Sequence, residues 1–400
     1  MRKGFIALTL CLSMIIIHVP GISIEAGQVH GVSKDAIKLG MISDMTGPAA
    51  HIGNKANMAT EVFFRNVNNA GGINGRKVKV FYEDSAHQTT KAIAAAKYLI
   101  ARRDIFAFLN VIGTSPALTV LPLVTEEKIP LITYNVSSRM FRPFNRYVFN
   151  IWTCEFDQAV IAVDYIVKDL KPRDPRIAII YPFDEYGREG LDAFQKATKY
   201  YGLKLVAAEP YKRGDIDFSS QIVRMKKTGA NYVYQPCVSL GPIMVQSHQL
   251  GFTPQFIGDV CSFSPKIIDI AGKAAKGLLV VHDKATWDEN VPGIVNLKEI
   301  TNKYKPDIIK GIDYYYLWAW VNANILAEGV KRAGHDLTRE SLVDALETLK
   351  DFQTGGLTPP ITYTKTSRKG TSYARLARAD LKMRTFIPVT DFRKPSLKQE

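Results

Sequence analysis

Residues 105–138 decide the fold; they read IFAFLNVIGTSPALTVLPLVTEEKIPLITYNVSS. Their first part, 105–112, is an apolar run whose length and aromatic and β-branched content predict a buried strand. A Gly-Thr-Ser-Pro turn then precedes an apolar stripe with helical spacing over residues 117–127. Residues 129–133 predict a second strand, which ends in the polar loop 134–138. This order of strand, helix and strand predicts a parallel sheet.

Polar side chains stand where these two predicted strands end. Thr114 and Ser115 follow the first strand, and Asn135 and Ser137 follow the second. Because parallel strands end at the same edge of their sheet, ligands of open α/β sheets bind there. We therefore expect a ligand-binding site at this edge. An alternative is that Thr114 or Ser115 only caps the helix that begins here.

The N-terminus has the pattern of a secretory signal peptide. A basic start, an apolar run over 5–19 and small residues after Pro20 are typical of such a segment, and the run is too short for a transmembrane helix. We expect the signal peptide to cover residues 1–26, with cleavage after Ser23 or Ala26. The mature protein is then expected outside the cytoplasm.

Charge and motifs exclude several classes of protein. The formal net charge is +14, but the lysines and arginines are scattered, without a long basic block or an aromatic-interleaved motif. The charge therefore indicates a solvated surface and no nucleic-acid partner. The chain has no Gly-x-x-x-x-Gly-Lys, no His-Glu-x-x-His and no paired Cys motif, so we expect neither a cofactor nor a metal site.

The cysteines do not indicate a disulfide scaffold. Three follow the signal segment, Cys154, Cys237 and Cys261. Cys237 and Cys261 each come after a predicted strand. The sequence leaves open whether these two form a disulfide or are buried thiols.

Strands and helices alternate along the whole chain. Residues 37–43 and 78–82 predict strands, with a helix over 52–67 between them. The alternation restarts later, with strands expected at residues 176–181, 203–207, 232–235 and 255–257. Helices are expected last, at residues 294–304, 312–329 and 338–349. Two such series in a chain of this length predict two lobes, each a parallel sheet covered by helices.

Five short motifs point to a family when they are taken in order. They are Thr-Gly-Pro at 46–48, Gly-Gly-Ile-Asn-Gly-Arg at 71–76, Glu-Asp at 83–84, Asp-Glu-Tyr-Gly-Arg-Glu-Gly at 184–190 and Asp-Phe-Ser-Ser-Gln at 217–221. Each alone is weak. Together they resemble the branched-chain amino acid-type periplasmic solute-binding proteins of ABC transporters, the leucine/isoleucine/valine-binding protein family, over nearly the whole mature chain.

The resemblance implies a type I periplasmic binding protein, with two Rossmann-like α/β lobes that contain parallel sheets. Three crossings between the lobes would form the hinge, and hinges permit closure over a ligand. The implied first lobe comprises residues 27–152 and 282–354. The second comprises residues 153–281 and 355–400, and residues 277–281 look like the return crossing.

The resemblance also implies a function. Such a protein captures a small carboxylate-bearing solute in the cleft between its lobes and presents it to the permease subunits of an ABC importer. It works as a monomer in the periplasm and has no enzymatic activity. A ligand-sensing receptor protein of the same fold is an alternative that the sequence leaves open.

The implied ligand-binding residues come from both lobes. They are Thr114, Ser115, Asn135, Ser137, Tyr186, Cys237 and Asp259. Thr114 matches a hydroxyl residue that binds the ligand carboxylate, and Ser115 stands beside it. Asn135 and Ser137 match the two positions on the following loop. Helix-start amides favour an anion there. Tyr186 matches the second-lobe aromatic residue that closes over the ligand.

One position departs from the family pattern. Where amino acid binders carry the acidic residue that meets the ligand ammonium, this chain has Val260, with Asp259 one place before it. A buried ammonium without a partner costs several kcal/mol. The sequence therefore leaves open an amino acid or an ammonium-free aromatic or aliphatic acid. Trp152 and Phe156 are candidates for the apolar walls.

A secreted α/β-hydrolase is a remote alternative. Ser115 lies between a strand and a helix, as in a nucleophile elbow, and Asp259 and His282 follow in the matching order. However, Ala117 stands where the elbow has glycine. Pro116 also lacks the N–H group that an elbow supplies to its oxyanion hole.

Overall fold

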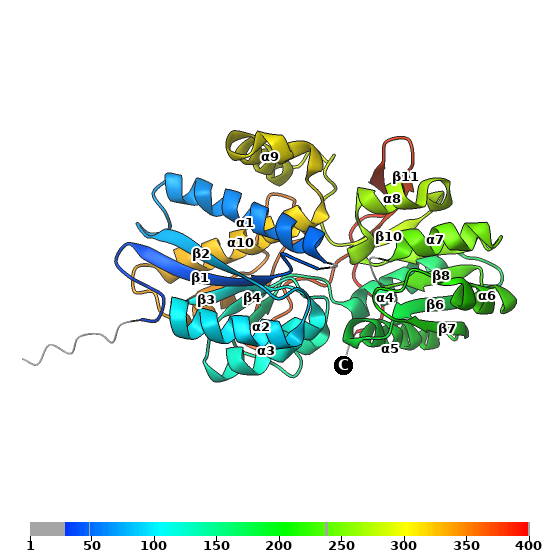
Figure 1. Ribbon diagram of the computed structural model, residues 1–400, viewed down its shortest axis with the longest axis horizontal. Coiled ribbons are helices and arrows are strands. Elements are labelled where there is room, and N and C mark those ends of the chain that lie inside the picture. Colours follow the sequence, from blue (N-terminus) through cyan, green and yellow to red (C-terminus); the bar gives the residue numbers. More distant parts are fainter. Residues whose placement is uncertain (1–28, 48, 237–238, 399–400) are drawn as a thin grey trace, which may run out of the picture.

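Two α/β lobes lie side by side in the computed structural model, which describes residues 29–47, 49–236 and 239–398 (Figure 1). Each lobe is built on its own sheet. The predicted signal peptide and Cys237 lie outside the described residues.

The first sheet is entirely parallel and has the order β2-β1-β3-β4-β5. Its strands are β1 (Ala36–Ser43), β2 (Lys77–Asp84), β3 (Ala107–Val111), β4 (Leu131–Thr133) and β5 (Val148–Asn150). Its helices are α1 (Ala50–Asn69), α2 (Thr89–Tyr98), α3 (Thr114–Glu126), α9 (Pro292–Tyr304), α10 (Tyr314–Ala333) and α11 (Arg339–Glu347). Helices α1 and α10 cover one face, and α2 and α3 cover the other (Figure 1).

The second sheet has the order β12-β11-β10-β9-β8-β6-β7. Its strands are β6 (Ile177–Pro182), β7 (Leu205–Tyr211), β8 (Tyr232–Gln235), β9 (Gln255–Gly258), β10 (Leu279–His282), β11 (Arg375–Asp380) and β12 (Thr385–Pro388). Its helices are α4 (Glu155–Asp164), α5 (Glu185–Tyr200), α6 (Ser219–Lys227), α7 (Leu240–Gln249) and α8 (Pro265–Ala271). Every residue of β6, which lies between β8 and β7, is buried, as expected where helices cover both faces.

Short helical segments complete the two lobes. The π-helical turns η1 (Leu99–Arg103) and η3 (Tyr165–Leu170) extend α2 and α4. The 3₁₀ turns are η2 (Ser138–Met140), η4 (Val260–Ser262), η5 (Gly272–Ala275) and η6 (Pro306–Gly311).

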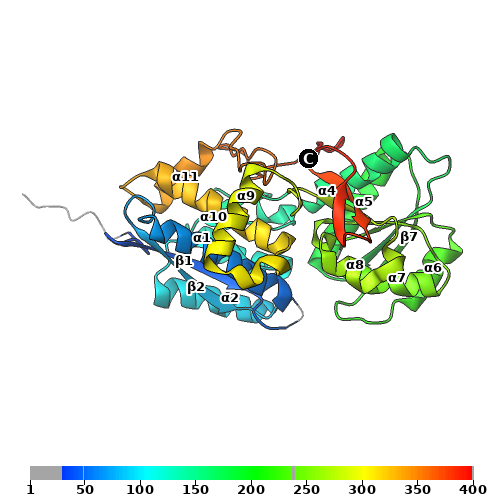
Figure 2. The ribbon, with the colours of Figure 1, turned by 90° about the horizontal axis from the view of Figure 1, so that it is seen from above.

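The structure confirms the predicted α/β class with parallel sheets in two lobes, and it corrects two details. Residues 277–281, expected as a return crossing, contain most of β10, which pairs with β9 inside the second sheet. Strands β11 and β12 pair antiparallel and were not predicted. They extend the second sheet near the C-terminal end of the described chain (Figure 2).

The chain passes between the lobes after β5, after β10 and before β11. The lobe boundaries of the sequence analysis stay a prediction. One observation favours a third crossing that begins after residue 355. The backbone of Lys369 forms an isolated β-bridge with Asn150, at the edge of the first sheet.

A buried ion pair lies in the crossing after β10 and bonds the crossing after β5. The Lys284 ammonium lies 2.8 Å from Asp283 Oδ1, and the Lys284 side chain is fully buried. Asp283 also accepts hydrogen bonds from the Thr153 amide and the Tyr314 hydroxyl. The ammonium lies over the rings of Trp152 and Tyr314. Burial lowers the pKa of Lys284, and Asp283 opposes this effect.

Replacing this lysine tests how much the crossings depend on the pair. Lys284→Met should lower the free energy of unfolding by about 3–5 kcal/mol, because Asp283 stays buried without its ammonium. Urea unfolding of the ligand-free protein measures the loss. Lys276→Met, at an exposed lysine just before β10, is the control. Equal stability of the two variants would show that the pair is not needed.

Candidate functional site

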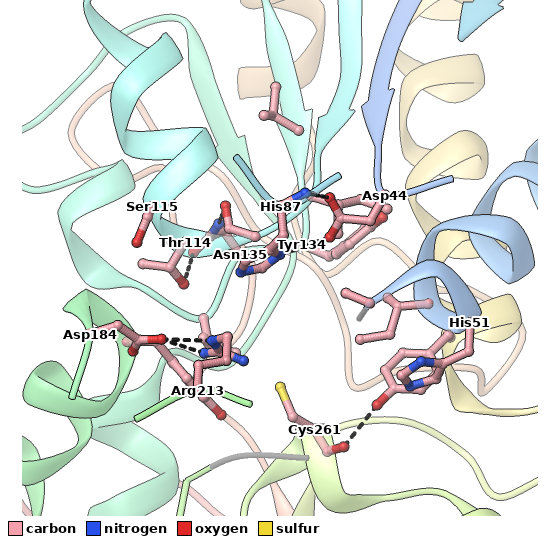
Figure 3. A pocket seen from close by; sticks show the side chains of 18 of the residues that line it. Asp44, His51, His87, Thr114, Ser115, Tyr134, Asn135, Asp184, Arg213 and Cys261 are labelled. Carbon is pink, nitrogen blue, oxygen red and sulfur yellow. Dashed lines mark hydrogen bonds and ion pairs between the residues drawn. The ribbon is translucent and has the colours of Figure 1, made fainter. Parts of the chain in front are cut away.

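A cavity of about 310 Å³ lies between the lobes. The loops that follow β1, β2, β3 and β4 line its first-lobe wall, and the loops that follow β6, β7, β8 and β9 line the other. Figure 3 shows His87, Thr114 and Asn135 on one side of this space, with Arg213 and Cys261 on the other. The carboxyl edges of both sheets therefore face the same cavity.

Four of the predicted site residues line this cavity. They are Thr114, Ser115, Asn135 and Tyr186. The Thr114 hydroxyl lies 3.5 Å from Asn135 Oδ1, so the ends of β3 and β4 do meet as predicted. Ser137 and Asp259 are not part of the lining, and Cys237 lies outside the described residues.

The start of α3 faces the cavity without a side-chain cap. Gly113, with φ +88°, precedes the helix, and no side chain caps its first amide groups. Thr114 and Ser115 are the first two residues of α3, so neither of them is its N-cap residue. Unsatisfied helix-start amides carry partial positive charge, so this end of the cavity favours an anion.

Ser137 contacts the opposite lobe instead of the cavity. Its hydroxyl donates to Glu189 Oε2 at 2.5 Å. The Ser138 amide and hydroxyl both donate to Glu189 Oε1 at 2.6 Å. Glu189 belongs to α5 of the second lobe, and Arg139 pairs with Glu185 of the same helix. The loop after β4 thus connects the lobes beside the cavity.

A second connection closes the far side of the cavity. The Tyr315 hydroxyl, at the start of α10, donates to the Cys261 carbonyl oxygen at 2.9 Å (Figure 3). His51 of α1 packs edge-on against the Tyr315 ring, with 5.8 Å between centroids. Both Cys261 and His51 line the cavity.

Asp259 orients the cavity wall from behind. Its side chain is fully buried and accepts a hydrogen bond from the Tyr186 hydroxyl. It also accepts one from the Cys261 amide at 3.1 Å. Burial raises the pKa of Asp259 to about 7. Burial, and then the charge of Asp259, raise the pKa of Glu155 well above its usual range.

The sequence analysis missed two side-chain pairs in the walls. His87 Nδ1 lies 2.8 Å from the buried Asp44 Oδ2. Arg213 donates from Nε and Nη2 to Asp184 Oδ2, at 2.8 and 2.6 Å. All four residues follow a strand closely, Asp44 after β1, His87 after β2, Asp184 after β6 and Arg213 after β7. Applying the strand-end rule to every strand would have found them.

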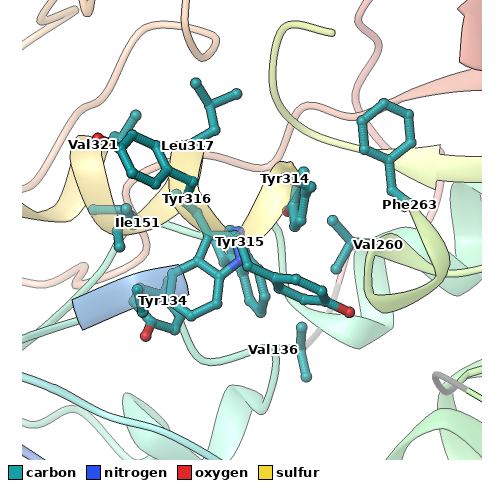
Figure 4. Close-up of a cluster of buried hydrophobic side chains, with 14 of the residues drawn as sticks. Tyr134, Val136, Ile151, Val260, Phe263, Tyr314, Tyr315, Tyr316, Leu317 and Val321 are labelled. Atoms are coloured by element: carbon teal, nitrogen blue, oxygen red, sulfur yellow. The ribbon is translucent and has the colours of Figure 1, made fainter. Parts of the chain in front are cut away.

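Aromatic side chains form the apolar part of the lining. Trp152, Trp318, Tyr134 and Tyr315 contribute to it. The Trp152 and Trp318 rings meet edge-on at 5.6 Å, and Tyr315 and Trp318 at 6.0 Å. Figure 4 shows Tyr134 and Tyr315 beside the start of α10. Phe156, the other candidate wall residue, is instead buried in the second-lobe core.

The hydrolase arrangement does not form. Asp259 binds Tyr186, and neither ring nitrogen of His282 has a hydrogen-bond partner among the described residues. The His282 ring is stacked on Phe263, with 4.1 Å between centroids. In the part of the chain that the structure describes, no cluster of His, Cys, Asp or Glu could hold a metal ion.

The raised pKa of Asp259 predicts a pH dependence of stability. Between about pH 4 and pH 7 the folded protein binds more protons at this carboxyl than the unfolded chain, whose Asp pKa is about 3.9. The free energy of unfolding should therefore fall with rising pH, by up to ~1.4 kcal/mol per pH unit more than in Asp259→Asn. Urea unfolding at several pH values measures both slopes. Asp336→Asn, at an exposed position, should keep the wild-type slope; parallel profiles for all three proteins would contradict the prediction.

Comparisons with known proteins agree with this geometry. The Leu/Ile/Val-binding protein homolog 3 of Brucella melitensis biotype 1 is 26% identical over 335 residues, which are 82% of this chain and 88% of that protein. A fatty acid ABC transporter substrate-binding protein from Thermomonospora curvata superposes with a TM-score of 0.84 at 21% identity, covering 92% of this chain and 95% of the other.

A second solved structure is equally similar in fold. It is a branched-chain amino acid ABC transporter protein from Thermus thermophilus with bound valine, with a TM-score of 0.83 at 23% identity, covering 91% and 98% of the two chains. The sequence model described as periplasmic binding protein matches residues 36–384. The chain therefore belongs to the periplasmic binding protein family, in the branched-chain amino acid type that its motifs indicated.

Proposed function

We propose that this protein is the extracytoplasmic solute-binding component of an ABC importer and that it binds a small carboxylate-bearing solute between its lobes. Its membership of the family and its cleft support this role. The predicted signal peptide places it in the periplasm, and the permease subunits are its proposed partners. Among the described residues, no helix is both long and apolar enough to cross a membrane.

One observation supports a solute that bears a carboxylate. The uncapped start of α3 opens into the cavity, with the Thr114 and Ser115 side chains beside it. Helix-start amides bind anions because their N–H groups point outward and the helix dipole is positive there. The two similar solved structures are named for a fatty acid and for valine, and a carboxylate is the group that these two compounds share.

Lobe closure is the proposed working step. The solute first binds the start of α3, and the second lobe then closes with Tyr186 and Arg213 over it. The bonds of Glu189 to Ser137 and Ser138, and of Tyr315 to Cys261, hold the lobes together once closed. Such closure excludes water and gives the permease a distinct surface to recognise. No covalent step is involved, and the protein acts as a monomer.

Thermal unfolding of the mature protein, refolded from denaturant to remove any carried solute, tests the proposal. A solute at 100 times its dissociation constant should add about 2.7 kcal/mol of stability. The panel should contain amino acids, aromatic acids, aliphatic acids and their amides. Stabilisation by carboxylates supports the proposal. Stabilisation by none of these compounds contradicts it.

A variant at Thr114 tests whether this residue binds the carboxylate. Thr114→Ala should weaken binding of the best carboxylate by about 1–3 kcal/mol, because it removes a polar partner from an enclosed site. Isothermal titration calorimetry measures the change. Thr119→Ala is the control: Thr119 lies on the same helix, but its hydroxyl donates to the Ser115 carbonyl oxygen and it does not line the cavity. Equal affinities of the two variants would remove Thr114 from the site.

A further inference from the structure

We infer that His87, oriented by Asp44, binds the solute carboxylate together with the start of α3, and that the solute is an organic acid with an apolar body and no ammonium. This inference rests on the proposed function and narrows its solute class. It assigns a specificity-determining role to a histidine that the sequence motifs did not indicate.

Asp44 fixes the orientation of the His87 ring. The Asp44 side chain is fully buried and accepts hydrogen bonds from Ser85 Oγ at 2.7 Å, the His87 amide at 2.6 Å and His87 Nδ1 at 2.8 Å. The backbone of Asp44 is held as well, since a Cβ atom at Gly53 of α1 would lie 2.0 Å from its carbonyl oxygen. Nδ1 therefore donates to Asp44, and in the imidazolium form Nε2 carries the second N–H group, which is the donor left for a solute carboxylate.

The ring lies against the start of α3. A Cβ atom at Gly113 would lie 2.7 Å from His87 Cε1 and 3.0 Å from Nδ1. Cε1 joins the two ring nitrogens, so Nε2 is close to the same helix start. The His87 side chain is about one-quarter exposed (24%) and lines the cavity. A carboxylate bound at the amides of α3 is then within reach of Nε2.

The carboxylates of the cavity wall are already engaged. In the described part of the chain three line it: Asp44, Asp184 and Asp215. Asp44 binds His87, and Asp184 binds Arg213 and caps α5 through the Gly187 amide. Asp215 accepts from the Lys212 amide. Asp44 and Asp184 are each paired with a side-chain nitrogen, and Asp215 is exposed to solvent, so an ammonium enclosed here would meet no buried and unpaired carboxylate, which is costly.

Apolar side chains receive the rest of the solute. The rings of Trp152, Trp318 and Tyr315 share the lining with Ile52 and Val136. Such walls favour an aromatic or branched hydrocarbon body, because burying it removes apolar surface from water. Apolar walls at one end and an anion-binding helix start at the other suit an apolar carboxylic acid.

Three compounds with the same carbon skeleton separate the contributions. They are 3-phenylpropanoate, L-phenylalanine, which adds an ammonium, and 3-phenylpropanamide, which removes the negative charge. Calorimetry on the refolded mature protein should show the acid binding at least tenfold more tightly than the other two. Tighter binding of phenylalanine would overturn the inference and leave the proposed function standing. If none of these compounds binds, and no amino acid or other acid of the wider panel binds, the inference and the proposed function are both contradicted.

Replacing the histidine tests its role directly. His87→Asn keeps a donor near the Nδ1 position and suits the left-handed backbone at His87, with φ +60°, but it removes Nε2. We expect at least a tenfold loss of affinity for 3-phenylpropanoate and little change in the melting temperature. His30→Asn is the matched control, because His30 Nδ1 also lies 2.8 Å from a carboxylate, that of Asp104, yet is outside the cavity. Wild-type affinity in His87→Asn would overturn the assignment.

Discussion

The direction of the strands is the constraint on which the site depends. In both lobes the central strands run parallel, so their carboxyl ends fall along one edge of each sheet. The two edges face one another, and nearly every polar residue of the cavity comes from a loop that follows a strand. The fold therefore gathers side chains that are far apart in sequence, and small changes in these loops alter the chemistry without altering the sheets.

Each acidic side chain named here at the cleft is bonded to another side chain of the protein. Asp44 holds His87, Asp184 holds Arg213, and Asp259 holds Tyr186. Each carboxylate fixes the orientation of a side chain that faces the cavity, so little conformational freedom is lost when a solute binds. The buried pair of Lys284 and Asp283 does the same for the crossings. The walls are thus arranged before the solute arrives.

The sequence predicted the fold class and the edge of the site, but only part of the site itself. Thr114, Ser115 and Asn135 line the cavity as predicted because strand ends converge at one edge of the sheet, whatever the details of packing. Ser137 does not line the cavity because its hydroxyl bonds Glu189, which lies 52 residues away on the other lobe. Asp259 does not line it either, because it bonds Tyr186, which is 73 residues away. His87 also follows a strand, but its orientation depends on a left-handed backbone conformation, with φ +60°, which the sequence motifs did not indicate.

A crystal structure of the protein with 3-phenylpropanoate would test the central claim most directly. The account predicts lobes closed over the acid, with the carboxylate oxygens about 2.7–3.2 Å from His87 Nε2 and from the first amides of α3, and with the phenyl ring against Trp152 and Trp318. A carboxylate bound at Arg213 instead, with the ring toward His87, would contradict it. So would an acid bound outside the cleft.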